Sequence, residues 1–178
     1  ASYCTSKGNS STYEWIDLVK LGSINNVTGS NAGYGNYTGL NTNLNAGTSN
    51  TITLSAGMNG SYREYWTVWI DYNKDGDFTD AGEKVTSYSS TSTGNTNRNF
   101  TIPTTAKNGA TRMRVQMKYN AYSTSCETFS YGEVEDYTVT IIGGSNIIGN
   151  LDNKISDYMA YPNPVSYTHL TLPTSNQV

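Results

Sequence analysis

Five acidic side chains are concentrated in the thirteen residues of segment 71–83. Asp71, Asn73 and Asp75 stand at positions 1, 3 and 5 of an EF-hand-type loop, where calcium-binding oxygens are required. Gly76 supplies the sharp turn at position 6. The segment directly follows the apolar run 66–70, so a strand would end in a loop of oxygen ligands. This spacing predicts a Ca²⁺ site.

The expected loop closes differently from that of an EF-hand. Glu83 stands at position 13, whereas an EF-hand places its bidentate glutamate at position 12. We therefore expect Asp77, Asp80 or Glu83 to complete the ligand shell without flanking helices. The alternative is a solvated turn without an ion, but five carboxylates this close together repel one another unless a cation is present.

Alternating apolar residues indicate the strands that position this loop. In segment 112–119 apolar and polar residues alternate, as in a strand with one buried and one wet face. In segment 62–72 we expect Trp66, Val68 and Ile70 to face inward. Further strands are predicted at 15–21, 51–55, 97–102 and 137–142. These seven or eight short strands predict an all-β, two-sheet antiparallel β-sandwich of jelly-roll or Ig-like type.

A second acidic group lies at 133–136. Glu133 and Glu135 share the parity of Tyr137, Val139 and Ile141, so they would face the core at the beginning of a strand. Buried carboxylates need a partner, which a calcium ion shared with the 71–83 loop would supply. Asp136 would join them if the strand bulges. The competing interpretation is catalytic, because residues i and i+2 of a strand are about 7 Å apart, as in inverting glycosidases.

Cys4 and Cys126 are the only cysteines, and neither belongs to a Cys-x-x-Cys pair. We predict a disulfide between them, against the alternative of two buried free thiols. A disulfide would place the protein in an oxidising, extracytoplasmic compartment.

The composition of the chain narrows the range of functions that the protein can have. The 178 residues carry a net charge of −3, which does not favour nucleic-acid binding. No stretch is apolar enough for a membrane span, and no signal peptide precedes Ala1, as expected of a mature or truncated product.

Rings and cations are predicted on the outward faces of two strands. If those strands are neighbours, they would form a shallow platform suited to a sugar, especially an anionic one. The alternative is an ordinary tyrosine-rich surface. The platform residues are Tyr65, Trp69, Arg112, Arg114 and Lys118.

The segments 69–78 and 131–137, with Tyr3, Cys4 and segment 22–26, resemble the GEVED domain, over residues 2–142. The resemblance implies an extracellular accessory module of bacteria that use type IX secretion, and it supports Asp71, Asn73, Asp75 and the 133–136 motif as characteristic residues. It implies no ligand. We expect this domain to span residues 1–142.

The tail is expected to be organised differently. Residues 143–160 read as a linker, and residues 161–164 resemble the opening of a type IX C-terminal sorting motif, which is truncated here. Residues 165–178 resemble a translated sequencing adapter, so we exclude them. They contain the chain's one histidine, His169, which leaves no histidine for catalysis or zinc binding in the rest of the chain.

The sequence thus predicts a secreted or cell-surface, non-catalytic module that is stabilised by Ca²⁺. It would attach a larger protein, through its neighbouring domains, to an extracellular polysaccharide or protein polymer. The alternatives are a structural spacer in an adhesin or protease, and a glycoside hydrolase that uses Glu133 and Glu135.

Overall fold

The computed structural model describes residues 2–146, and its regular elements there are ten β-strands without a helix. Expectations for residues 147–178, which include most of the linker, the sorting motif and the tail, lie outside the described residues. No helix in the described part is long and apolar enough to cross a membrane. The strands are β1 (Lys7–Ser10), β2 (Glu14–Leu21), β3 (Ile24–Val27), β4 (Tyr34–Asn45), β5 (Ser49–Met58), β6 (Glu64–Ile70), β7 (Lys84–Ser90), β8 (Thr96–Thr101), β9 (Gly109–Tyr119) and β10 (Thr128–Ile142).

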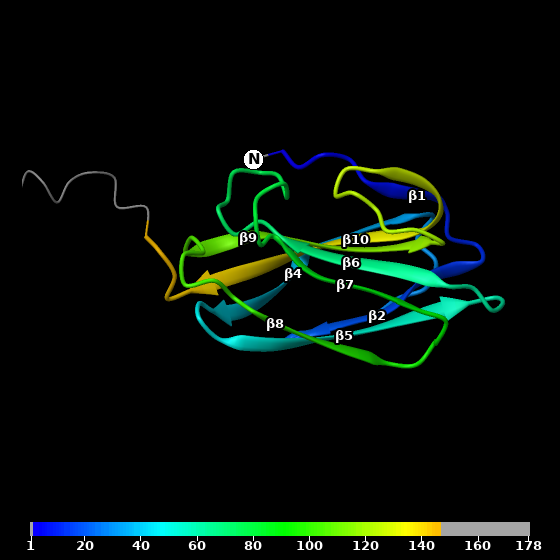
Figure 1. Ribbon diagram of the computed structural model, residues 1–178, viewed down its shortest axis with the longest axis horizontal. Helices are drawn as coiled ribbons and strands as arrows, with labels where there is room; N and C mark the ends of the chain where they lie inside the picture. Colours follow the sequence, from blue (N-terminus) through cyan, green and yellow to red (C-terminus); the bar gives the residue numbers. More distant parts are fainter. Residues whose placement is uncertain (1, 147–178) are drawn as a thin grey trace, which may run out of the picture. The chain divides into compact units, whose positions relative to one another are not determined.

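The strands form two sheets packed face to face (Figure 1). The larger sheet has the order β1-β10-β9-β6-β7, and β4 also pairs with β10. The smaller sheet has the order β3-β2-β5-β8. The predicted all-β sandwich is therefore confirmed.

The core lies between the sheets and follows the alternation of the sequence. Trp66, Val68 and Ile70 of β6 are buried, as predicted. Inward residues of β2 and β5, such as Ile16 and Leu54, pack against them from the smaller sheet. Because apolar burial is worth about 25 cal/mol per Å², this interior supplies the main driving force for folding.

Two strand pairs in the larger sheet are parallel. Residues 128–131 of β10 pair with β1, and residues 134–142 pair with β4. Parallel neighbours require long connections rather than hairpins, so the N-terminal part of the chain must cross between the sheets. The sandwich is thus mainly, but not wholly, antiparallel.

A layer of irregular chain covers the outer face of the larger sheet. It consists of the N-terminal segment and the loops after β6 and β9, which lie above β9, β10 and β6 in Figure 1. The predicted disulfide between Cys4 and Cys126 joins two parts of this layer, with an S–S distance of 2.07 Å. It closes a loop with a sequence separation of 122 residues.

Residues 143–146 continue to contact this folded unit. The Gly144 N–H donates to Asn108 Oδ1 at 2.7 Å, and the Ser145 N–H donates to the Ala106 carbonyl at 2.8 Å. The first residues of the predicted linker are therefore hydrogen-bonded to the loop that precedes β9.

Candidate functional site

Three carboxylates converge in the loop after β6. One oxygen each of Asp75, Asp77 and Asp80 lies within 4.8 Å of the others, and the side chains are exposed or half-buried. Asn73 lies against the same group, with Nδ2 2.9 Å from Asp75 Oδ2 and 2.6 Å from Asp80 Oδ2. Hard oxygen donors of this kind suit Ca²⁺, and rotating the Asn73 amide would add a further oxygen.

Hydrogen bonds between neighbouring residues of the loop hold this group together. The Asp75 N–H donates to Asn73 Oδ1, and the Asp77 N–H donates to Asp75 Oδ1 at 3.1 Å. The bond from the Asp77 N–H, followed by that from the Asn73 side chain, lowers the pKa of Asp75. Asp75 therefore stays ionised at neutral pH, as a calcium ligand must.

Asp71 and Glu83 instead organise the loop's backbone. Asp71 is fully buried, and its carboxylate accepts from the Lys74 N–H at 2.5 Å, the Gly76 N–H at 3.0 Å and the Tyr3 hydroxyl at 2.7 Å. Glu83 accepts from the Tyr72 N–H at 2.9 Å. Of the predicted ligands, Asp75, Asp77 and Asp80 form the cluster with Asn73, while Asp71 and Glu83 brace the loop beside it.

Glu133 and Glu135 face the core, as the strand parity predicts, and both are fully buried. Glu133 accepts from the Ile16 N–H at 2.9 Å and the Asn31 N–H at 2.6 Å, so it joins β10 to β2 and to the loop before β4. Glu135 accepts from Thr28 Oγ1 at 2.9 Å and from Tyr137 Oη at 2.7 Å.

Burial raises the pKa of both groups, and that of Glu135 reaches about 7. The hydrogen bonds to Glu133 and Glu135 oppose this effect. These donors satisfy the carboxylates that we expected a metal to satisfy.

The predicted sharing of one ion between the 71–83 loop and these glutamates is wrong. Asp71 follows β6 on the outer face of the sheet, whereas Glu133 and Glu135 point from the inner face. The Asp71 N–H donates to the carbonyl of Arg112 on β9, and Arg112 lies opposite Thr138 on β10. Asp71 is therefore level with Thr138, which lies two strands away. Glu135 and Glu133 then lie about 10 and 17 Å further along that strand, at roughly 3.3 Å per residue.

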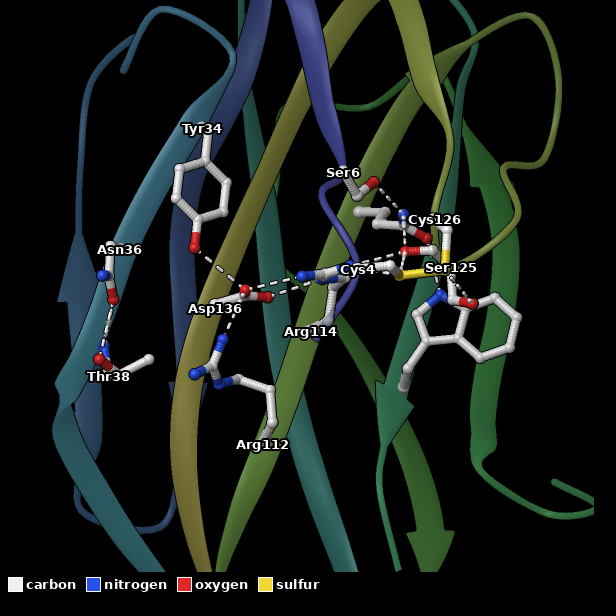
Figure 2. Close-up of polar contacts among 12 residues, drawn as sticks. Cys4, Ser6, Tyr34, Asn36, Thr38, Arg112, Arg114, Ser125, Cys126 and Asp136 are labelled. Atoms are coloured by element: carbon white, nitrogen blue, oxygen red, sulfur yellow. Dashed lines mark hydrogen bonds and ion pairs between the residues drawn. A yellow bond between two sulfur atoms is a disulfide. The ribbon is translucent and has the colours of Figure 1, made fainter. Parts of the chain in front are cut away.

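Asp136 is held by two arginines (Figure 2). Arg114 Nε and Nη2 donate to its two oxygens at 2.8 and 2.9 Å, which is a bidentate pair with both side chains buried. Arg112 Nη1 and the Tyr34 hydroxyl contact Oδ2 at 2.9 and 3.1 Å. These contacts give Asp136 partners other than the acidic cluster of the 71–83 loop, so the structure lends its prediction as a calcium ligand no support.

The predicted platform of rings and cations is covered. Its strands are neighbours, because β6 pairs with β9, but the side chains are occupied by the layer above them. Arg114 is only 2 % exposed and donates to the Ser125 carbonyl at 2.7 Å. Trp69 packs against Phe78 of the loop after β6, with ring centroids 6.5 Å apart, and its Nε1 donates to Gln116 Oε1 on β9 at 2.7 Å.

Two further platform residues, near the start of β6 and the end of β9, also contact side chains of the covering layer. Lys118 forms an ion pair with Glu127, and Tyr65 packs edge-on against Tyr122 with ring centroids 4.9 Å apart. Arg112 stays partly accessible, with 25 % of its side chain exposed. The alternation predicts which face these residues share but carries no signal for the chain that covers it.

A cleft of about 450 Å³ opens beside the Asp136 network. It is bounded by the N-terminal segment on one side and by β4, β9 and β10 on the other. Its accessible cations are Lys7 and Arg112, and the guanidinium carbon of Arg112 lies 4.6 Å from the Tyr3 ring centroid. Tyr34 adds a second ring. Sequence reasoning missed Tyr3, Lys7 and Tyr34, since they come from segments far from β9 in the chain.

Residues 65–140 match the family model of the GEVED domain. The match runs from β6 into β10 and includes the acidic loop and the 133–136 motif. It confirms the predicted resemblance for this part of the chain. A comparison with curated proteins finds no match.

The GEVED region does not form the sandwich alone. Strands β1 to β5 precede it in the chain, and β1 and β4 complete its sheet on the far side of β10. In the GEVED motif, Glu133 and Glu135 anchor the inner face to the other sheet, and Asp136 anchors the outer layer. The acidic residues of this motif thus make contacts on both faces of one strand.

Proposed function

We propose that this chain is a non-catalytic, calcium-stabilised accessory module of a secreted or cell-surface protein, and that it attaches its parent protein to an extracellular polymer. The observation that carries the proposal is the convergence of Asp75, Asp77 and Asp80 in a loop that is braced by buried acids. Calcium bound there would fix the loop that covers Trp69 and Arg114, through contacts of Phe78 with both.

Two further features support an extracellular, non-catalytic role. The Cys4–Cys126 disulfide suits an oxidising compartment. Glu133 and Glu135, which the hydrolase alternative would use for catalysis, are fully buried, with an exposed fraction of 0 %. A glycosidic bond cannot reach them in this fold.

Calcium is expected to raise the melting temperature. An ion that binds the folded state alone, with a dissociation constant of about 10 μM, adds about 2.7 kcal/mol at a hundredfold excess. For a domain of this size, that corresponds to a rise of roughly 5–10 °C. Melting scans in chelator, in about 1 mM Ca²⁺ and in about 1 mM Mg²⁺ measure the effect, and Mg²⁺ should do much less because it demands a small octahedral site.

The matched variants for this test are Asp80→Asn in the cluster and Asp17→Asn on β2 of the other sheet. Asp80→Asn should abolish most of the calcium response, and Asp17→Asn should keep it. A melting temperature that does not respond to calcium, in protein shown to be metal-free beforehand, would remove calcium from the proposed function.

The cleft beside Asp136 is the surface that we assign to the polymer. It combines an exposed Lys7, Arg112 and two tyrosine rings, which favours an anionic polysaccharide or an acidic protein. We expect Lys7→Ala to reduce retention on an anionic polymer by several-fold, since it removes an exposed charge without touching the core. Lys20→Ala, an equally exposed lysine on β2, is the control.

Affinity electrophoresis in gels that contain acidic and neutral polysaccharides, together with pull-down on immobilised collagen, measures this retention. Retention that Lys7→Ala and Lys20→Ala change equally would refute the cleft as the binding surface. A protein that responds to calcium but binds no polymer would instead be a spacer.

A further inference from the structure

Two carboxylates enter the interior from opposite sheets at one end of the sandwich, where β2 and β6 begin (right-hand end of Figure 1). Glu14 is the first residue of β2 and Glu64 is the first residue of β6. Glu14 is 3 % exposed and Glu64 is 0 % exposed. They share the inward parity of Ile16 and Trp66, which belong to the core.

Neither carboxylate has a hydrogen-bonding partner within residues 2–146. Both oxygens of Glu64 are buried without a donor, and no hydrogen bond or ion pair reaches Glu14. This is the opposite of Glu133 and Glu135, which each accept two or more bonds. Buried, unpaired carboxyl groups cost several kcal/mol unless they are neutral or partnered, so a pair of them calls for an explanation.

The two groups also disfavour each other's charge. Burial raises the pKa of Glu14 to about 7. Burial, and then the charge of Glu14, raise the pKa of Glu64 to about 8. A cation placed beside them would relieve both effects.

Four tyrosines surround the opening above these carboxylates. Glu14 lines a hollow of about 300 Å³ whose other walls are Tyr13, Tyr62, Tyr119 and Tyr131. Three edge-to-face contacts connect the rings, with centroids 6.3 Å apart for Tyr13 and Tyr62, 6.0 Å for Tyr13 and Tyr131, and 5.8 Å for Tyr62 and Tyr119. The rings come from two strands and two loops that are distant in the sequence.

We propose that this hollow, which we call the tyrosine pocket, binds a primary alkylammonium group, with the rings around its charge and Glu14 as its counter-ion. Aromatic faces attract cations through their quadrupoles, most strongly where water is excluded. A buried carboxylate behind the rings supplies the full opposite charge. Glu64 lies deeper and adds its negative charge to the same field.

The chemistry of the pocket favours this ligand over a metal ion. Calcium takes six to eight oxygen ligands, whereas the hollow is lined by four tyrosines and a single carboxylate. A primary ammonium donates up to three hydrogen bonds, which is what the unpartnered carboxylates lack. A quaternary ammonium would satisfy the rings but could donate nothing to Glu14.

The size of the hollow sets the scale of the ligand. At about 300 Å³ it stands at the lower limit of small-molecule sites, so it fits a head group with a few carbons rather than a whole drug-sized molecule. Such a group occurs on a free amine or at the end of a lysine side chain. Both present the same chemistry to the pocket.

Titration of the ¹⁵N-labelled full chain at pH 8.5, followed by amide chemical shifts, tests the proposal. The probes are n-butylammonium, its neutral counterpart 1-butanol, tetramethylammonium and Nα-acetyl-lysine amide. We expect saturable shifts around Glu14 and Tyr119 with n-butylammonium, at least tenfold weaker binding of 1-butanol, and weaker binding of tetramethylammonium. Comparable binding of the lysine amide indicates a peptide source, and weaker binding indicates a free amine.

Matched variants locate the site. Glu14→Gln should weaken n-butylammonium binding at least tenfold, whereas Glu127→Gln, in the loop after β9, should not. Tyr119→Leu should weaken it about two- to fivefold, as expected for one cation–π contact, and Tyr122→Leu, an exposed ring outside the pocket, should leave it unchanged.

Equal binding of butanol and butylammonium overturns the proposal, and so does unchanged binding in a folded Glu14→Gln variant. Tighter binding of tetramethylammonium overturns the role of the carboxylates as hydrogen-bond acceptors. If Glu14→Gln does not fold, the comparison of probes on the natural chain, with Tyr119→Leu against Tyr122→Leu, still decides the question.

Discussion

Arg114→Met is expected to destabilise the folded state by about 3–5 kcal/mol, the typical cost of removing one partner of a buried ion pair. The variant leaves Asp136 buried with one partly exposed arginine, and it removes the donor to the Ser125 carbonyl. Replacing both members of the pair by apolar residues, in Arg114→Met with Asp136→Leu, should recover a large part of the loss. Equilibrium unfolding in urea, with all four combinations of the two substitutions, measures the coupling.

Arg112→Met is the matched control for this prediction. Arg112 also contacts Asp136, but a quarter of its side chain is exposed, and exposed ion pairs contribute about 0–1 kcal/mol. Similar losses for Arg112→Met and Arg114→Met would mean that burial does not decide the strength of this network.

Stability is expected to fall as the pH rises from about 5 to 9. The folded-state pKa values of Glu14 and Glu64, about 7 and about 8, lie above the ordinary glutamate value of 4.5. The folded state therefore holds these protons over a range in which the unfolded chain has lost them. Their contribution is complete below about pH 4.5 and is lost as the pH passes through 7 and 8.

The magnitude follows from the same linkage. A pKa difference of one corresponds to about 1.4 kcal/mol, so the rise from 4.5 to about 7 and to about 8 corresponds to at most about 8 kcal/mol by pH 9. Urea unfolding at several pH values in chelator measures the slope. Glu64→Gln should flatten it, while Glu127→Gln should not. An unchanged slope in Glu64→Gln would show that the stability loss arises elsewhere.

The inner faces of the sandwich were predictable because side chains alternate with period two. Trp66, Val68 and Ile70 follow that rule, and so do Glu133 and Glu135, whose burial was expected in spite of their charge. The positions of the central strands also followed from apolar alternation. For these elements, local pattern and tertiary burial give the same answer.

The strands that the sequence did not reveal are polar. β1, β3, β4 and β7 are rich in Asn, Ser, Thr and Gly, and much of β4 is exposed. β1 and β4 pair with β10, about a hundred residues away, whereas β3 and β7 pair with the strands directly before them, β2 and β6. A local pattern carries no signal for a partner as distant as β10.

The candidate sites also divide into those that a local sequence pattern reveals and those that it does not. The acidic loop was predictable because its spacing lies within thirteen residues, although the parts played by Asp71 and Glu83 were not. Neither the tyrosine pocket nor the chain that covers Arg114 was predictable. Each is assembled from segments that only the complete fold brings together.

The pairing of β10 with β1 and β4 has a consequence for how the chain acquires its structure. β10 supplies the hydrogen-bonding partner of both strands, so neither can complete its place in the sheet until the chain has emerged as far as residues 128–142. Contacts between such distant segments slow folding, typically to milliseconds or longer. A chain delivered from its N-terminus, by a ribosome or through an export channel, therefore remains incompletely folded until nearly all of the domain has emerged.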